Sequence, residues 1–398
     1  MTKILISAGE ASGDLHAAAV TRALKNIDNS IEVFGMGGEN LQAAGGEVLF
    51  DYKLYSVMGF EAVLKNFPTI ARLMGDFVKV MDERKPDLVL AVDYPGFNMV
   101  LSELARERGI PVLYLIPPSA WAWKRKRAKK IAQITDRVAC VLPNEYAVYK
   151  EDGARAEFVG HPLVDLVKPT MTQEEAKAFA GLKDGERLVV IIPGSREKEI
   201  KHMLSILLEA AKLLQAEEPN LSFAMPKAKS ISKATLEAQI KASGVEVKIT
   251  EDHNYDLFSV GSLALAKSGT VTMEAALCGL GSVIVYKMDP IFYFLAKRFV
   301  KIKDIGLPNI VAGHRVFPEL IQEDCNPQAI AREAKKLLTA SGQEQIARDI
   351  VLIRENLGGG GAAERVAKLA LEVAAGPRPI VTSTSLKLKI VHLLLNIF

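Results

Sequence analysis

The sequence predicts an α/β protein made of two doubly wound, Rossmann-like domains that face each other across a cleft. The chain has 398 residues, which is too long for one ordinary hydrophobic core and favours two domains of similar size. Short runs rich in Val, Ile and Leu alternate with helical patterns through the first half, and the alternation starts again after residue 165. This βαβ rhythm is typical of mostly parallel sheets with helices on both faces.

Each expected strand is a short apolar run that is followed by a turn or a helical pattern. In the first half the expected strands are Lys3–Ser7, Ile31–Gly35, Leu88–Val92, Val112–Ile116, Arg137–Leu142 and Ala156–Val159. Helical patterns between them include Leu15–Asn26 and Val100–Arg108. In the second half the expected strands are Leu188–Ile192, Leu221–Met225, Val245–Ile249, Ser262–Ala266 and Ser282–Tyr286.

Proline and glycine mark the expected domain limits. "GHPLVDLVKPT" (Gly160–Thr170) holds two prolines where the rhythm changes, which predicts domains 1–165 and 166–361. The glycine run Gly358–Gly361 ends the second domain, and one last helix is expected over 362–375. The tail 376–398 ends in "LKLKIVHLLLNIF", which is too short to span a bilayer; whether it lies on a membrane, packs on the fold or is disordered is left open.

Composition excludes several classes of protein. A net charge of +3 gives no bulk attraction to nucleic acid, so no nucleic-acid partner is expected. The three cysteines are far apart and fit neither a disulfide framework nor a metal site, so no metal is expected. The first residues lack a secretory signal, and no apolar run approaches the roughly 20 residues of a membrane-spanning helix.

Two loops after expected strands of the second half have the character of a diphosphate site. "IIPGSREKEI" passes through Gly194 and Ser195 and places Arg196 at a helix start. "AKSGTVTMEAALCG" leaves its strand through Ser268-Gly269-Thr270. In doubly wound sheets, ligands bind beyond the carboxyl ends of the strands, where amides at helix starts face anions and an arginine adds a bidentate fork. The alternative is that Ser268 and Thr270 only cap a helix and that Arg196 is a solvated charge.

Further contacts to a nucleotide are expected nearby. Glu274, one turn into the second helix, is a candidate to accept both ribose hydroxyls. In the polar loop 306–322, Asn309 and Gln322 are candidates for base or sugar contacts, although Asn309 after a proline is equally good turn chemistry.

The first half offers a carboxylate where a strand ends. "AVDYPGFN" places Asp93 directly after Leu88–Val92, and Tyr94-Pro95-Gly96 then break the strand. An acid in this place is a candidate general base for a substrate hydroxyl, while an N-cap for the next helix is the alternative. In "SAGEASGDLHA" (Ser7–Ala17), Gly9 and Gly13 do not have the GxGxxG spacing of a dinucleotide site, and Glu10 and Asp14 stand where they would repel a pyrophosphate. His16 is expected to be packed or on the surface.

Two stretches suggest a membrane or lipid surface. "PPSAWAWKRKRAKK" (Pro117–Lys130) combines Trp121 and Trp123 with six basic residues. The stretch 63–80 repeats apolar residues at helical spacing, which favours an amphipathic helix packed on the core, with lipid contact as the alternative. The candidate membrane contacts are Phe67, Ile70, Met74, Phe77, Trp121 and Trp123.

Eight motifs in order resemble those of lipid-A-disaccharide synthases. They are "SAGEASGDLHA", "DYPGFN", "PPSAWAWK", "LPNEYAVY", "FVGHPLVD", "PGSREKEI", "KSGTVTMEA" and "GLPNIVAG", and the resemblance covers residue 3 to about residue 372. It implies a GT-B glycosyltransferase of lipid A biosynthesis, peripheral on the inner face of the Gram-negative cytoplasmic membrane and needing no metal or other cofactor. Some members of the family exchange C-terminal segments, so a homodimer is a further expectation.

The resemblance also implies the substrates and their sites. The family transfers 2,3-diacylglucosamine from its UDP donor to the 6-hydroxyl of 2,3-diacylglucosamine 1-phosphate, with inversion to a β-1,6 link and release of UDP. Asp93 matches the candidate base, and Arg196, Glu274, Asn309 and Gln322 match donor-side positions. "SAGEASGDLHA" then falls in the acceptor half. There, Ser12 and the amides near Gly13 are candidates to bind the 1-phosphate or ring hydroxyls of the acceptor. Glu10 and Asp14 are candidates to accept hydrogen bonds from its sugar hydroxyls or to orient the loop, and a charge at the helix start is the alternative for Asp14. The rivals are a UDP-N-acetylglucosamine 2-epimerase, a cell-wall N-acetylglucosaminyltransferase and a non-catalytic protein that binds anionic lipid.

Overall fold

The computed structural model describes residues 1–55, 60–120, 125–228, 230–289, 293 and 303–379. These residues form two compact units, and each has its own parallel sheet. Unit 1 comprises Met1–Pro162 together with the chain from Gly359 onward, and unit 2 comprises Leu163–Gly358. The helix expected over 362–375 is present, and it belongs to the first unit.

Unit 1 contains a seven-stranded sheet in the order β3-β2-β1-β4-β5-β6-β7. Its strands are β1 (Lys3–Ala8), β2 (Glu32–Gly37), β3 (Glu47–Asp51), β4 (Leu88–Val92), β5 (Val112–Leu115), β6 (Arg137–Cys140) and β7 (Ala156–Phe158). Its helices are α1 (Ala11–Ile27), α2 (Glu39–Ala43), α3 (Phe60–Arg84), α4 (Pro95–Glu107), α5 (Lys126–Ile134), α6 (Pro143–Glu151) and α17 (Ala362–Ala375), with a 3₁₀ turn at Tyr52–Leu54. The strand order reverses between β1 and β4, which makes their carboxyl ends the switch point of this sheet.

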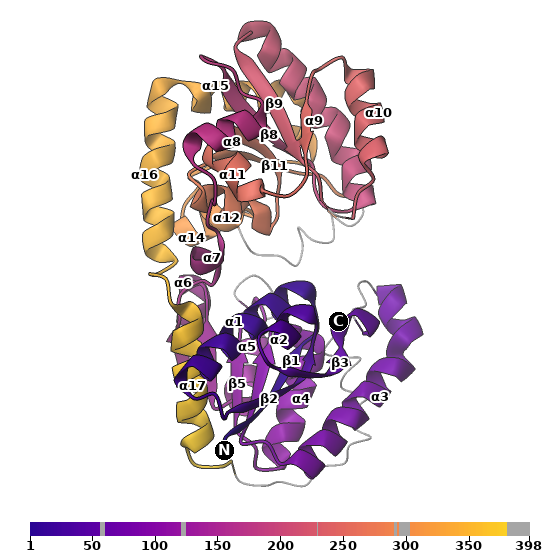
Figure 1. The fold of residues 1–398 in the computed structure, drawn as a ribbon, viewed down its shortest axis with the longest axis vertical. Helices are drawn as coiled ribbons and strands as arrows, with labels where there is room; N and C mark the ends of the chain where they lie inside the picture. Colours follow the sequence, from indigo (N-terminus) through magenta and orange to yellow (C-terminus); the bar gives the residue numbers. More distant parts are fainter. Residues whose placement is uncertain (56–59, 121–124, 229, 290–292, 294–302, 380–398) are drawn as a thin grey trace. The chain divides into compact units, whose positions relative to one another are not determined.

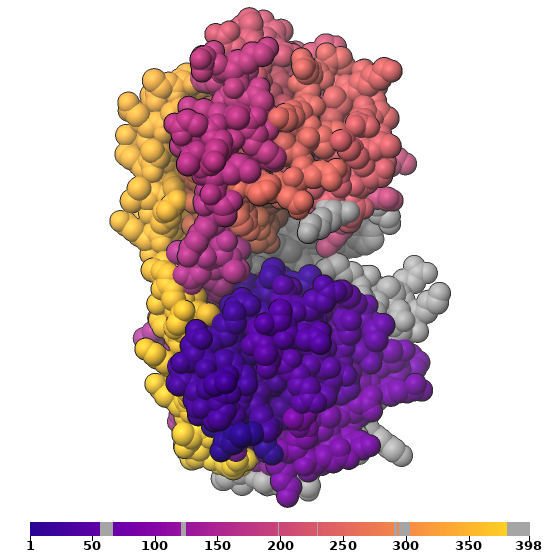
Figure 2. Space-filling model, in the orientation of Figure 1, coloured from indigo at the N-terminus to yellow at the C-terminus, as the bar shows by residue number. Residues whose placement is uncertain are grey.

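Helices cover both faces of the first sheet (Figure 1). Helices α1 and α17 pack against each other and against β4 on one face, whereas α3, α4 and α5 cover the other face. Figure 2 shows α17, in yellow, lying against N-terminal residues in indigo. Arg365 fixes the start of α17, because its guanidinium donates to the carbonyl oxygens of Val159 at 2.8 Å, Gly359 at 2.9 Å and Gly360 at 2.9 Å.

The packing of helix α3 contradicts part of the predicted membrane surface. Ile70, Met74 and Phe77 are buried in the core of unit 1 with residues of the sheet and of α4. The Phe77 ring lies 5.4 Å from the ring of Phe97. The prediction that these three side chains contact a membrane is therefore wrong, and Phe67 is half-buried against the same core. Trp121 and Trp123 lie outside the described residues.

Unit 2 repeats the plan with a six-stranded sheet in the order β10-β9-β8-β11-β12-β13. Its strands are β8 (Arg187–Ile192), β9 (Leu221–Pro226), β10 (Lys248–Thr250), β11 (Gly261–Lys267), β12 (Ser282–Tyr286) and β13 (Glu319–Ile321). Its helices are α7 (Leu163–Leu166), α8 (Gln173–Ala180), α9 (Glu197–Glu217), α10 (Lys233–Ser243), α11 (Asn254–Ser259), α12 (Thr270–Leu277), α14 (Leu307–Ala312), α15 (Pro327–Leu338) and α16 (Ala340–Asn356), with a 3₁₀ turn at Gln322–Asp324. Its switch point lies between β8 and β11, which pair in parallel.

Helices also cover both faces of the second sheet (Figure 1). Helices α9, α10 and α15 cover one face, and α8, α11 and α12 pack on the other around the buried residues Leu257 and Phe258. The strand expected over Val245–Ile249 is displaced to Lys248–Thr250, and β3 and β13 were not expected. Both of the unexpected strands lie at an edge of their sheet, and neither has more than three consecutive apolar residues.

Candidate functional site

Asp93 lies in a strained turn at the switch point of unit 1. Asp93 and Tyr94 directly follow β4 and both adopt the left-handed conformation, with φ of 48° and 50°. This conformation is unfavourable for residues other than glycine and persists only where the surroundings impose it. The buried amide of Asn98 donates to the carbonyl oxygens of Val92 at 3.1 Å and Asp93 at 2.8 Å, and the Tyr114 hydroxyl donates to Asp93 O at 2.9 Å. The direction of the Asp93 side chain is therefore fixed by the fold.

The environment of Asp93 suits a general base. Burial, and to a smaller extent the nearby carboxylate of Glu10, raise the pKa of its carboxyl to about 6. Glu10 lies near Asp93 because Ala8 pairs with Val92, and this pairing brings the loop after β1 beside the loop after β4. A carboxylate with a pKa close to neutral pH accepts a proton from a hydroxyl more readily than an ordinary aspartate does.

Gly9 allows the loop after β1 to approach this turn closely. A Cβ atom on Gly9 would lie 2.3 Å from the Tyr94 ring, so no other residue fits without moving that ring. Gly9 and Asn98 were not expected to shape this site, although they stand within "SAGEASGDLHA" and "AVDYPGFN". Ser12 is exposed on the first turn of α1 and Gly13 is buried against Ala8, and their contacts to a substrate stay predictions.

Asp14 is a structural residue. Its carboxylate is only 1% exposed and accepts hydrogen bonds from the backbone amides of Gly38 at 2.6 Å, Asn40 at 3.1 Å and Leu41 at 3.2 Å. The side-chain amide of Asn40 donates a further bond at 2.9 Å. These are the otherwise unpaired amides at the start of α2, so Asp14 caps that helix. The prediction that Asp14 contacts a substrate is wrong.

The two loops predicted to hold a diphosphate meet in unit 2. They line one pocket of about 390 Å³ at the switch point, with Gly194, Ser195 and Arg196 on the β8–α9 side and Ser268, Gly269 and Thr270 on the β11–α12 side. The pairing of Ile192 with Ala266 brings the two strand ends together. Both loops lead directly into helices, whose first amides face the region beyond the strands.

Two further charged residues of this pocket were missed by sequence reasoning. Lys267, the last residue of β11, places its ammonium 2.9 Å from Oε1 of Glu199 on α9, and the Arg196 guanidinium lies 3.7 Å from the same oxygen. Glu199 Oε2 accepts the backbone N–H of Ser195 at 3.0 Å. Burial opposes ionisation of Glu199, but the bonds from Lys267 and Ser195 outweigh it and lower the pKa. Glu199 thus shapes the loop and holds both cations beside the pocket.

Gly194 is required by this arrangement, and we expect Gly194→Ala to weaken binding of UDP, the diphosphate ligand that the sequence predicts for this pocket. Its φ is 123°, and a Cβ would lie 2.6 Å from Oε2 and 2.9 Å from Cβ of Glu199, so the loop must shift. Gly185→Ala is the matched control, because Gly185 has φ of 81° with open space around it. Both variants lose about 1 kcal/mol of stability from the unfavourable φ. Calorimetry should show weaker UDP binding in Gly194→Ala only; equal affinities would contradict this role of the loop.

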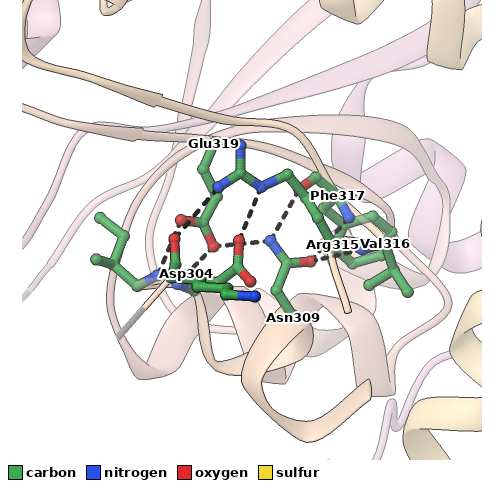
Figure 3. A network of polar contacts seen from close by, with 9 residues as sticks. Asp304, Asn309, Arg315, Val316, Phe317 and Glu319 are labelled. Atoms are coloured by element: carbon green, nitrogen blue, oxygen red, sulfur yellow. Dashed lines mark hydrogen bonds and ion pairs between the residues drawn. The ribbon is translucent and has the colours of Figure 1, made fainter. Parts of the chain in front are cut away.

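The side-chain amide of Asn309 forms all of its hydrogen bonds within its own loop (Figure 3). Its Nδ2 donates to Phe317 O at 2.8 Å and Glu319 Oε1 at 2.7 Å, and its Oδ1 accepts the amides of Val316 at 3.0 Å and Phe317 at 2.8 Å. The side chain is 1% exposed and its two donors and two acceptor positions are all used. The expected direct contact to a nucleotide base or sugar is therefore wrong for this side chain, which positions the loop instead.

Gln322 and Glu274 lie outside the 390 Å³ pocket. The Gln322 amide is bonded to both the N–H and the carbonyl of Met288, at 2.8 and 3.1 Å, and lines a second pocket of about 490 Å³ with Lys201, His202 and Lys287. Glu274 is half-buried on α12, and burial raises its pKa. Their contacts to a donor stay predictions.

Neither a cluster typical of a metal site nor a membrane-spanning helix occurs among the described residues. No cluster of three or more His, Cys, Asp or Glu side chains with the arrangement of a metal site occurs in this part of the chain. Within the same ranges, no helix combines the length and the apolar character needed to cross a membrane.

The two Rossmann-like units, each with a polar site at its switch point, define a protein of the GT-B class. Solved structures of this fold agree. A UDP-GlcNAc 2-epimerase from Neisseria meningitidis bound to UDP-GlcNAc has a TM-score of 0.65 at 16% identity and covers 93% of this chain and 100% of its own. CalG4, the calicheamicin glycosyltransferase, has a TM-score of 0.61 at 13% identity and covers 94% and 100%. At these identities the likeness shows the fold alone.

The family follows from the sequence comparisons. The model of the lipid-A-disaccharide synthetase family matches residues 4–373. A lipid-A-disaccharide synthase of Geobacter sulfurreducens is 41% identical over 372 residues, which is 93% of this chain and 97% of the relative. A lipid-A-disaccharide synthase of Nitrosococcus oceani is 38% identical over 94% of this chain and 96% of the relative. The chain belongs to the lipid-A-disaccharide synthetase family and is a glycosyltransferase of lipid A disaccharide formation.

Proposed function

We propose that the protein transfers 2,3-diacylglucosamine from its UDP donor to the 6-hydroxyl of 2,3-diacylglucosamine 1-phosphate. The anomeric carbon is inverted, and the products are the β-1,6-linked disaccharide 1-phosphate and UDP. One observation carries the proposal: each sheet has a polar site at its switch point, a carboxylate with a raised pKa in unit 1 and an anion pocket with Arg196 and Lys267 in unit 2. A base for a hydroxyl and a site for a leaving diphosphate are the two parts that such a transfer needs.

The proposed step forms one bond and breaks one. The oxygen of the acceptor hydroxyl attacks C1 of the donor sugar, and Asp93 takes the proton of that hydroxyl. The bond from C1 to the diphosphate oxygen breaks at the same time. Negative charge then grows on the leaving UDP. Arg196, Lys267 and the amides at the start of α12 stabilise that charge, because they are already in place before the reaction.

Both substrates carry acyl chains, so the proposed place of action is the inner face of the cytoplasmic membrane. Trp121 and Trp123 remain the candidate membrane contacts from the basic stretch that leads into α5. A homodimer also remains a proposal.

The test is UDP release from UDP-2,3-diacylglucosamine in detergent, measured with and without 2,3-diacylglucosamine 1-phosphate. The proposal predicts release only when the acceptor is present, together with a disaccharide product. Release without acceptor would point to a hydrolase, and no release with both substrates would overturn the proposal. Incubation with UDP-N-acetylglucosamine alone covers the epimerase rival, since formation of a 2-epimer would favour that activity.

A further inference from the structure

The start of helix α9 already holds an anion of its own, the carboxylate of Glu199. Glu199 lies in the first turn of α9, and its Oε2 accepts the backbone N–H of Ser195 at 3.0 Å, just ahead of the helix. Amides at the start of a helix have no partner within the helix, and together with the helix dipole they attract negative charge. A carboxylate that folds back toward them takes the place that a phosphate takes at other helix starts.

The same carboxylate also lies beside the cations of the 390 Å³ pocket. Its Oε1 is 2.9 Å from the Lys267 ammonium and 3.7 Å from the Arg196 guanidinium. The side chains of Lys267 and Glu199 are both only 18% exposed, so salt and water screen this pair less than a surface pair. All three charged side chains line the pocket. A diphosphate that enters it therefore meets one negative charge as well as two positive charges.

The start of α12, which lines the same pocket, carries no such group. Its first turn, Thr270–Met273, contains no acidic residue, and its N-cap is Gly269, which has no side chain. A Cβ atom on Gly269 would have open space around it. An anion can thus approach the start of α12 without meeting an acid of that turn, whereas at the start of α9 it meets Glu199.

We propose that Glu199 is an internal counter-ion that competes with the diphosphate of UDP for Lys267, Arg196 and the start of α9. This inference rests on the proposed function, in which UDP is the product that leaves this pocket. Like charges in one pocket repel, and a phosphate that binds Lys267 has to share the ammonium with Glu199. The carboxylate keeps the cations and the loop in place for the next donor. Glu199 thereby limits how tightly the pocket retains UDP.

The experiment is calorimetric titration of UDP into the wild-type protein and into Glu199→Gln, at low and at high salt. Glutamine has nearly the same shape and still offers one hydrogen-bond acceptor, but it carries no charge. We expect Glu199→Gln to bind UDP about 3- to 10-fold more tightly at low salt, because one repulsive charge is removed at a partly screened distance. The gain should shrink at high salt, where ions screen that repulsion.

Two further variants separate the charge of Glu199 from its shape. Glu199→Asp keeps the negative charge, so it should not bind UDP more tightly than the wild type. Glu197→Gln is the matched control, because Glu197 is an exposed acid of the same first turn that does not line the pocket, and its Kd for UDP should stay close to that of the wild type.

The outcomes distinguish this inference from the proposed function. If Glu199→Gln binds UDP no more tightly than the wild type, Glu199 only orders the loop and the inference is wrong, while the proposed function stands. A gain that Glu199→Asp shares, or that is the same at both salt concentrations, would also overturn it. If the wild type itself does not bind UDP, the proposed function fails.

Discussion

Replacing Asp93 with Asn lowers turnover by about 10³-fold, which lies within the range that general bases contribute, while the Kd for UDP does not change. The amide cannot accept the proton of the acceptor hydroxyl, and the donor pocket belongs to the other unit. The measurement is steady-state UDP release combined with calorimetric titration of UDP. Asp87→Asn is the matched control, because Asp87 precedes the same strand at its opposite end and is bonded to Lys3 N and Arg378. Normal turnover of Asp93→Asn would show that another group is the base.

The same substitution should stabilise the protein, which separates catalysis from structure. The folded pKa of Asp93 is raised from 3.8 to about 6, so the stabilising protonated form is fully present below 3.8 and is lost as the pH rises through 6. Above pH 6 the wild type carries the cost of a buried charge, up to about 3 kcal/mol at roughly 1.4 kcal/mol per pKa unit. The asparagine variant lacks this cost. Its gain in the free energy of unfolding should appear between pH 4 and pH 6 in urea titrations and persist at higher pH.

Arg196→Ala should weaken UDP binding about 10- to 100-fold and reduce kcat as well, as expected for loss of a charged hydrogen-bond partner. Arg196 lines the pocket beside the two helix starts, and its guanidinium lies 3.7 Å from Oε1 of Glu199. Arg348→Ala is the matched control on α16, because both side chains are 63% exposed. Unchanged UDP affinity in Arg196→Ala would remove Arg196 from the donor site.

The parts of the site that the sequence predicted are those where one local signal is enough. An apolar strand that ends in "DYP" or "PGSR" sets its last residues at the carboxyl edge of a parallel sheet, and this held for Asp93 and for Arg196. The strands that were missed, β3 and β13, are edge strands without a buried apolar run.

The predictions for other residues were wrong because the partners of these residues lie far away in the sequence. Asp14 caps a helix that begins at Glu39, and Asn309 binds a turn at Val316 and Phe317, contacts that no local pattern reveals. The stripe of Ile70, Met74 and Phe77 has the same spacing whether it faces lipid or a sheet. Lys267 and Glu199 are 68 residues apart in the sequence, and only the fold brings them together.

We propose that a carboxylate at the switch point of unit 1, whose pKa is raised by burial and by Glu10, activates the acceptor. The most direct measurement is the pH dependence of kcat/KM for the acceptor in the wild type and in Glu10→Gln, with the same acceptor in both. Because Asp93 must be ionised to accept a proton, the wild-type rate should rise with pH through an apparent pKa of about 6. Removing the neighbouring negative charge should move this rise to lower pH. Profiles that superimpose, or a wild-type rate that is flat across this range, would contradict the account.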